Sequence, residues 1–154
     1  MSAPTSRVMS IEDDPHDRLL LSRSVEKCGI DCELDFMHDG EQARNHLVAL
    51  SRGSGDDRWP DLILLDLTLP VFDGWALLSW IRSEPSLRHL VVIILSTSKD
   101  ERDVRWCHRN GASCYLVKPS SLEAFDDMVC RIDRFWLQTA RLPTKGELDD
   151  GARR

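Results

Sequence analysis

Hydrophobic and polar residues follow one another along the chain in blocks that predict five β-strands. Residues 62–65 and 90–95 are continuously apolar, which is typical of strands buried on both faces of a parallel sheet. Residues 31–36 instead alternate between acidic and apolar side chains, which predicts a strand at the edge of the sheet with one face in water. Shorter segments at 7–12 and 115–117 complete the predicted sheet.

Helical patterns lie between these strands, and most of them follow a residue that caps helices. Asp14 precedes Pro15, Asp39 precedes Gln42 at a capping-box spacing, and Asp73 precedes an apolar helical pattern. The predicted helices cover about residues 15–28, 40–50, 74–83, 99–110 and 121–137. Five strands that each precede a helix predict an α/β domain whose parallel sheet is covered on both faces.

Length and charge narrow the possible functions. The 154 residues suffice for one domain, expected at 7–137, and a tail at 138–154 with little apolar content that is expected to be partly disordered. A formal charge of −6 argues against binding to nucleic acid or to an anionic membrane surface. No apolar run approaches the roughly 20 residues that span a bilayer, and the N-terminus does not resemble a signal peptide. We therefore expect a cytoplasmic protein.

The cysteine pattern agrees with that location. The chain has five cysteines, an odd number, and none of them forms a Cys-x-x-Cys pair. Most of them fall inside apolar segments. We therefore expect small core residues in a reducing cytosol rather than a disulfide framework or a zinc site.

Charged or hydrogen-bonding groups stand at the carboxyl ends of four predicted strands. They are Glu12, Asp13 and Asp14 after the first strand, Asp66 after the third, Ser96 and Thr97 after the fourth, and Lys118 after the fifth. Any one of them alone is more often a turn or capping residue. Ligands of parallel α/β sheets bind beyond the carboxyl ends of the strands, so the set predicts one crevice that holds several carboxylates, a hydroxyl and an ammonium.

This set of groups indicates phosphoryl chemistry. Clustered carboxylates repel one another, and a divalent cation relieves the repulsion. Mg²⁺ fits best because it prefers a few carboxylates, water and a phosphate, whereas zinc and copper prefer the Cys and His side chains that these strand ends lack. A carboxylate beside Mg²⁺ can attack phosphorus and form an aspartyl phosphate. Lys118 can then neutralise the transferred group, and Ser96 can donate a hydrogen bond to it.

Four segments together resemble the receiver domain of two-component response regulators. They are Ile11-Glu12-Asp13-Asp14-Pro15, Leu64-Leu65-Asp66-Leu67-Thr68-Leu69-Pro70 with Asp73-Gly74, Leu95-Ser96-Thr97-Ser98, and Tyr115-Leu116-Val117-Lys118-Pro119. The resemblance covers residues 7–137 and is greatest to the stand-alone regulators associated with bacterial phytochromes. It implies a flavodoxin-like (βα)5 domain with a five-stranded parallel sheet in the order 2-1-3-4-5.

The resemblance also implies how the acids divide their roles. Asp66 is expected to accept a phosphoryl group from a sensor histidine kinase, such as a bacteriophytochrome, or from a histidine phosphotransfer protein. Asp13 and Asp66 are expected to bind Mg²⁺, together with the backbone carbonyl of Thr68 and, through water, Glu12. Thr68 stands where Asn is common in the family, which leaves the dephosphorylation rate open.

The remaining strand-end residues are expected to hold the phosphoryl group and to report it. The resemblance implies that Lys118, Ser96 and Thr97 bind the phosphoryl group, and that the bond from Lys118 to Pro119 is cis. Ser96 also matches the hydroxyl of the conformational switch, in place of the more usual Thr, and Tyr115 matches the switch aromatic.

Two other functions fit parts of the sequence. A small aspartate-nucleophile phosphatase would use the same acids, but such enzymes commonly place a second acid where this chain has Thr68. A flavodoxin-type cofactor site needs a phosphate-binding loop where this chain has repelling acids. We therefore expect a signalling domain rather than an enzyme, with Mg²⁺-dependent self-phosphorylation and slow autodephosphorylation. Since no second domain follows, we expect output through partner binding, relay to another histidine or dimerisation.

The last predicted helix has more apolar surface than one sheet requires. Five residues at spacings of 3, 4, 3 and 4 predict a stripe packed on the sheet: Leu122, Phe125, Val129, Ile132 and Trp136. Neighbouring apolar residues widen the arc to roughly 160°. We expect the surplus around Phe135, Trp136 and Met128, extended by Leu142-Pro143, to form a homodimer interface. The alternative is that Phe135 packs under the tail of its own chain.

Overall fold

The five predicted strands form one parallel sheet. The computed structural model describes residues 5–53 and 58–143. The strands are β1 (Ser6–Ile11), β2 (Cys32–Met37), β3 (Leu62–Asp66), β4 (Val92–Ser96) and β5 (Cys114–Val117), and they lie in the order β2-β1-β3-β4-β5. Every pair of neighbours is parallel. The predicted flavodoxin-like fold and its strand order are thus confirmed, with β2 at one edge.

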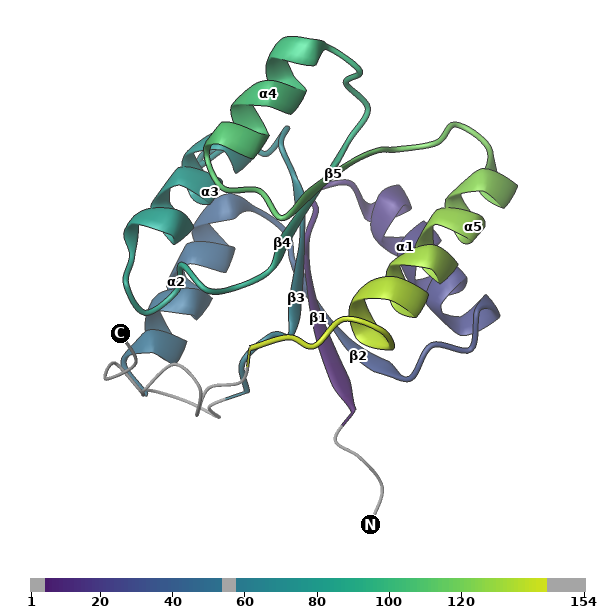
Figure 1. Ribbon diagram of the computed structural model, residues 1–154, viewed down its shortest axis with the longest axis horizontal. Coiled ribbons are helices and arrows are strands. Elements are labelled where there is room, and N and C mark those ends of the chain that lie inside the picture. The colour runs from purple at the N-terminus through teal and green to yellow at the C-terminus, as the bar shows by residue number, and fades with distance from the viewer. Residues whose placement is uncertain (1–4, 54–57, 144–154) are drawn as a thin grey trace.

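The helices form a layer on each face of the sheet. They are α1 (Pro15–Lys27), α2 (Gly40–Ser51), α3 (Gly74–Ser83), α4 (Glu101–Arg109) and α5 (Leu122–Ile132). Figure 1 shows α2, α3 and α4 on one side of the strands and α1 and α5 on the other. The predicted last helix extends to Leu137 as expected, but its final turn is a π-helix, η1 (Asp133–Leu137).

Side-chain caps explain where the helices begin. The Asp14 carboxylate accepts a hydrogen bond from the backbone N–H of His16 at 2.8 Å, and Asp39 accepts one from Gln42 at 2.7 Å. Ser121 caps α5 in the same way, because its hydroxyl oxygen accepts a hydrogen bond from the N–H of Ala124 at 3.1 Å. These bonds satisfy backbone donors that have no partner within the helix. Asp14 is therefore occupied at the start of α1.

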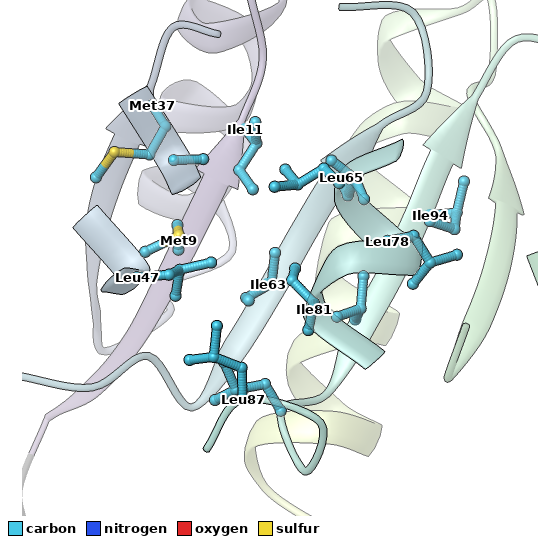
Figure 2. Packing of buried hydrophobic residues seen from close by; sticks show 14 of the residues in the cluster. Met9, Ile11, Met37, Leu47, Ile63, Leu65, Leu78, Ile81, Leu87 and Ile94 are labelled. Carbon is cyan, nitrogen blue, oxygen red and sulfur yellow. The ribbon is translucent and has the colours of Figure 1, made fainter. Parts of the chain in front are cut away.

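The central strands are buried on both faces, as their apolar runs predict. In β3, Ile63 and Leu65 pack with α2 and α3 in one core, while Leu62 and Leu64 pack with α1 and α5 in the other. Figure 2 shows the first of these cores, where residues such as Leu47 and Leu78 meet the strands. No helix in the described part of the chain is long and apolar enough to cross a membrane.

The expectation that the cysteines are core residues without a disulfide is wrong for two of them. Cys28, at the end of α1, forms a disulfide with Cys130 of α5, 102 positions further along the chain. The two Cα atoms lie 5.7 Å apart because α1 and α5 pack side by side on the same face of the sheet. Local spacing cannot reveal such a pair. Cys32, Cys107 and Cys114 are free thiols, and Cys107 is a core residue as expected.

The stripe predicted for the last helix is also partly wrong. Phe125, Val129 and Ile132 are buried as predicted, and Trp136 packs against the same core. Leu122, however, is 53% exposed, because it is the first residue of α5 and stands before the helix reaches the sheet. The stripe therefore begins one turn later than the spacing predicts.

The disulfide predicts a defined thiol count and a stability effect. Denatured, unreduced protein should react with iodoacetamide at three of its five cysteines, and a Cys28→Ala variant at four. Reduction should lower the free energy of unfolding by about 2–4 kcal/mol, because the bond closes a long loop in the unfolded chain. A Cys114→Ala variant, which keeps the bond, should show two reactive thiols. Five reactive thiols in unreduced wild-type protein would contradict the pairing.

Candidate functional site

The carboxyl ends of three strands meet at one acidic site. Glu12 and Asp13 follow β1, Asp66 ends β3, and Lys118 follows β5. The parallel register aligns these ends. Ile11 of β1 pairs with Leu65 of β3, Asp66 of β3 pairs with Leu95 of β4, and Ser96 of β4 pairs with Val117 of β5. The residues that the sequence places at separate strand ends are therefore brought together.

Lys118 is the centre of this site. Its Nζ lies 2.6 Å from Glu12 Oε1, 3.0 Å from Asp17 Oδ2 and 3.1 Å from Asp66 Oδ2, and its side chain is 10% exposed. Burial alone would lower the pKa of Lys118, but the hydrogen bond to Glu12 and the charges of Asp66 and Glu12 outweigh it and raise the pKa above its ordinary value. The ammonium therefore stays charged among the carboxylates.

Glu12 has both of its carboxylate oxygens engaged. Oε1 accepts the short hydrogen bond from Lys118, and Oε2 accepts one from the backbone N–H of Asp14 at 3.3 Å. Burial raises the pKa of Glu12 to about 8, and the nearby Asp66 acts in the same direction against the opposing effect of Lys118. Ionised Glu12 is therefore disfavoured beside Asp66, and added positive charge at the site would favour it.

Three carboxylates of this site can hold a cation. Ligand oxygens of Glu12, Asp13 and Asp66 lie within 4.8 Å of one another. All three donors are carboxylate oxygens, the type that hard divalent cations such as Mg²⁺ prefer. Asp13 is exposed and free to turn toward a cation, whereas the oxygens of Glu12 are occupied. The donor set thus fits a divalent metal with Glu12 in a supporting position.

The loop after β3 fixes the position of Asp66. The N–H of Thr68 donates to Asp66 Oδ1 at 2.9 Å, and the N–H of Gly74 donates to the carbonyl of Leu67 at 3.0 Å. A Cβ at Gly74 would lie 2.3 Å from the carbonyl oxygen of Asp66, so only glycine allows α3 to begin this close to the strand end. Thr68 itself is exposed.

The predicted switch residues lie around the end of β4. Ser96 is buried, and its hydroxyl oxygen accepts a hydrogen bond from the N–H of Ser98 at 3.1 Å. The Tyr115 hydroxyl donates to the carbonyl oxygen of Ser98 at 2.8 Å. Thr97 is exposed between them. Ser98, in the loop after β4, thus contacts the hydroxyls of both Ser96 and Tyr115.

Two features of the site differ from the expectations. Asp17, in the first turn of α1, contacts Lys118 and was not among the predicted site residues. Acids are also favoured in the first turn of a helix by the helix dipole, so the sequence alone does not identify Asp17 as a site residue. The bond from Lys118 to Pro119 is trans, against the expectation, since no cis peptide occurs among residues 5–53 and 58–143. Trans is the favoured form for proline bonds, and Lys118 reaches the acids with it.

Comparison with known proteins decides the family. The model of the response regulator receiver domain matches residues 8–130. The chain belongs to the response regulator receiver family. The response regulator Rcp1 of Synechocystis sp. is 36% identical over 142 residues, which cover 92% of this chain and 96% of Rcp1.

Solved structures of the family agree. The phosphorylated cyanobacterial phytochrome response regulator RcpA is 33% identical, with a TM-score of 0.81 over 92% of this chain and 100% of its own. The bacteriophytochrome response regulator AtBRR is 29% identical, with a TM-score of 0.67 over 92% and 100% of the two chains. The structure of Rcp1 in its Mn²⁺-bound form, 34% identical, has a TM-score of 0.77 over 92% and 100%.

This receiver domain is therefore a response regulator, a signalling protein that a histidine kinase phosphorylates. Binding of a divalent metal is a property of receiver domains, and the acidic cluster of this chain is consistent with it. The relatives include regulators of phytochromes, as the sequence resemblance predicts.

The carboxylate geometry predicts unequal losses of metal affinity. Asp13→Ala should weaken metal binding by about tenfold or more, equivalent to at least about 1.4 kcal/mol, because it removes an unengaged ligand. Glu12→Ala should have a smaller effect, because Lys118 and a backbone N–H already occupy Glu12. Titration with Mn²⁺, followed through the electron paramagnetic resonance of the free ion, measures both.

Asp14→Ser is the matched control for this titration. It removes a neighbouring negative charge and keeps a residue that caps α1. We expect metal affinity close to that of the wild type. A larger loss in Asp14→Ser or Glu12→Ala than in Asp13→Ala would contradict the ligand assignment.

Proposed function

We propose that Asp66 is the residue of this receiver domain that accepts the phosphoryl group. The observation that carries this assignment is the Lys118 ammonium, 3.1 Å from Asp66 Oδ2 at the end of β3. An Asp66 carboxylate oxygen forms a bond to phosphorus as the bond from phosphorus to the imidazole nitrogen of the donor breaks. The electron pair of that bond remains on the nitrogen.

The surrounding residues neutralise and hold the transferred group. Lys118 supplies a positive charge to one phosphoryl oxygen, and the hydroxyls of Ser96 and Thr97 supply hydrogen bonds. Asp13 and Asp66, with the carbonyl of Thr68 and with Glu12 through water, would hold Mg²⁺. When bound, Mg²⁺ supplies charge neutralisation at the phosphoryl oxygens. The domain would thus catalyse its own phosphorylation and slow dephosphorylation without acting on another substrate.

Ser96 and Tyr115 are the proposed switch. Movement of the Ser96 hydroxyl toward the phosphoryl group would break its bond to the N–H of Ser98, whose carbonyl also accepts the bond from Tyr115. The phosphoryl group would then favour a second arrangement of the loop after β4, to the extent that it interacts more favourably with that arrangement than with the first.

The phosphate donor is proposed to be a bacteriophytochrome-type histidine kinase in the cytoplasm. The likeness to RcpA and AtBRR, whose names link them to phytochromes, supports this partner. The net charge of −6 supports a protein partner rather than nucleic acid or an anionic membrane.

A homodimer through the carboxyl-terminal part of α5 and through η1 is a second proposal. Phe135 is 55% exposed and contacts the Trp136 ring edge to face, with the ring centres 5.1 Å apart. A groove of about 390 Å³ lies beside it, and its lining includes Cys114, Leu116, Met128, Ile132, Phe135 and Trp136. Because β5 is an edge strand of the sheet that the described residues form, this groove lies next to a strand edge. A second copy of the chain would cover both.

The Asp66 assignment predicts a single mass change. With Mg²⁺ and acetyl phosphate, the intact mass of the wild-type protein should rise by one phosphoryl group, and Asp66→Asn should abolish the increase. Asp31→Asn, an exposed acid remote from the site, should be labelled like the wild type. Labelling of Asp66→Asn, or full labelling of the wild type in excess chelator, would count against the proposal.

The dimer is tested with two matched substitutions. Phe135→Asp should give a monomer in sedimentation velocity at micromolar concentration, because it places a charge on the proposed interface. Leu19→Asp changes an equally exposed apolar residue on α1, where the exposed fraction is 59%, and should leave the dimer intact. A wild-type monomer, with or without phosphorylation, would refute the interface.

A further inference from the structure

The contact between Lys118 and Asp17 has no part in the roles proposed so far. A lysine ammonium has three N–H donors, and the carboxylates of Glu12, Asp17 and Asp66 accept all three. When Asp66 carries a phosphoryl group, the phosphoryl oxygens replace its carboxylate charge, and Lys118 must divide its three donors among these oxygens, Glu12 and Asp17. The carboxylates therefore compete with the phosphoryl group for the ammonium.

Of the two acceptors that phosphorylation leaves unchanged, Asp17 can be released with the smaller loss. Its side chain is 31% exposed, against 8% for Glu12 and 13% for Asp66. A carboxylate that regains water loses little when its ion pair breaks, whereas a buried one is left without compensation. Asp17 is also the one acceptor of the three that comes from a helix, so it draws the ammonium toward α1 and away from the strand ends.

We propose that Asp17 is a positioning residue that holds the Lys118 ammonium toward α1 in the unphosphorylated protein and so limits the affinity of the site for a phosphoryl group. This inference rests on the roles proposed for Asp66 and Lys118. Asp17 touches neither the phosphoryl group nor the metal and acts through Lys118. Its removal leaves the ammonium bound to Glu12 and Asp66, at the place where the phosphoryl group arrives.

Beryllofluoride, a mimic of the phosphoryl group, measures this competition at equilibrium. Calorimetric titration of the full chain with beryllofluoride and Mg²⁺ should give tighter binding for Asp17→Ala than for the wild type, by roughly two- to fivefold, the range of a partly exposed ion pair. Asp17→Asn should gain less, because its amide oxygen still accepts from Lys118, and Asp17→Glu should bind like the wild type. Damage to the fold would weaken binding, so a gain in affinity separates positioning from a structural role.

Asp14→Ser is the matched control for charge alone. It removes one negative charge at the same end of α1, keeps the helix cap and has no bond to Lys118. Its affinity should stay near that of the wild type. Unchanged or weaker binding by Asp17→Ala, or an equal gain in Asp14→Ser, would overturn the positioning role. Failure of the wild type to bind, or unchanged binding by Asp66→Asn, would instead overturn the assignment of Asp66.

Discussion

One ammonium shared among three carboxylates is the interaction on which the site depends. Lys118 is contributed by the chain after β5, Glu12 by the chain after β1, and Asp66 by the end of β3. Without the positive charge, the buried acids would repel one another, and burial already raises the pKa of Glu12 to about 8. The same charge that stabilises the resting site is the one that a phosphoryl group needs. Under the roles proposed for Asp66 and Lys118, phosphoryl binding is therefore an exchange of partners for Lys118.

The sheet makes this exchange possible by holding its contributors rigidly. The central strands are buried on both faces, so their register is fixed by two cores at once. On one face, α1 and α5 are joined by the disulfide and by the bonds from Ser24 and Lys27 to Asp126. The helix that carries Asp17 is thus tied to the helix that carries the proposed dimer interface.

The sequence predicts the features that follow from local pattern. The continuous apolar run at 62–65 predicts a doubly buried strand, and the acids placed just after such strands predict a shared site because parallel strands end together. The cap residues Asp14 and Asp39 predict helix starts for the same local reason. These inferences need neighbours in the sequence only, together with the rule that parallel strands point one way.

Features that depend on packing between distant segments could not be predicted in this way. The pairing of Cys28 with Cys130 requires knowing that α1 and α5 are adjacent. In the sequence, Asp17 looks like any acid in the first turn of a helix, and only its contact with Lys118 in the structure sets it apart. Leu122 fits the helical spacing of the core stripe, yet it is exposed as the first residue of α5.

Chemical trapping tests directly whether the carboxylate at the end of β3 carries the phosphoryl group. Reduction of the phosphorylated protein with borohydride converts an aspartyl phosphate to homoserine, and peptide mass spectrometry then locates it. We expect homoserine at position 66 alone, in a sample first treated with acetyl phosphate and Mg²⁺. Homoserine at position 13 or 17, hydroxynorvaline (the reduction product of a glutamyl phosphate) at position 12, or a phosphoryl group on a residue that borohydride does not reduce, would contradict the assignment of Asp66.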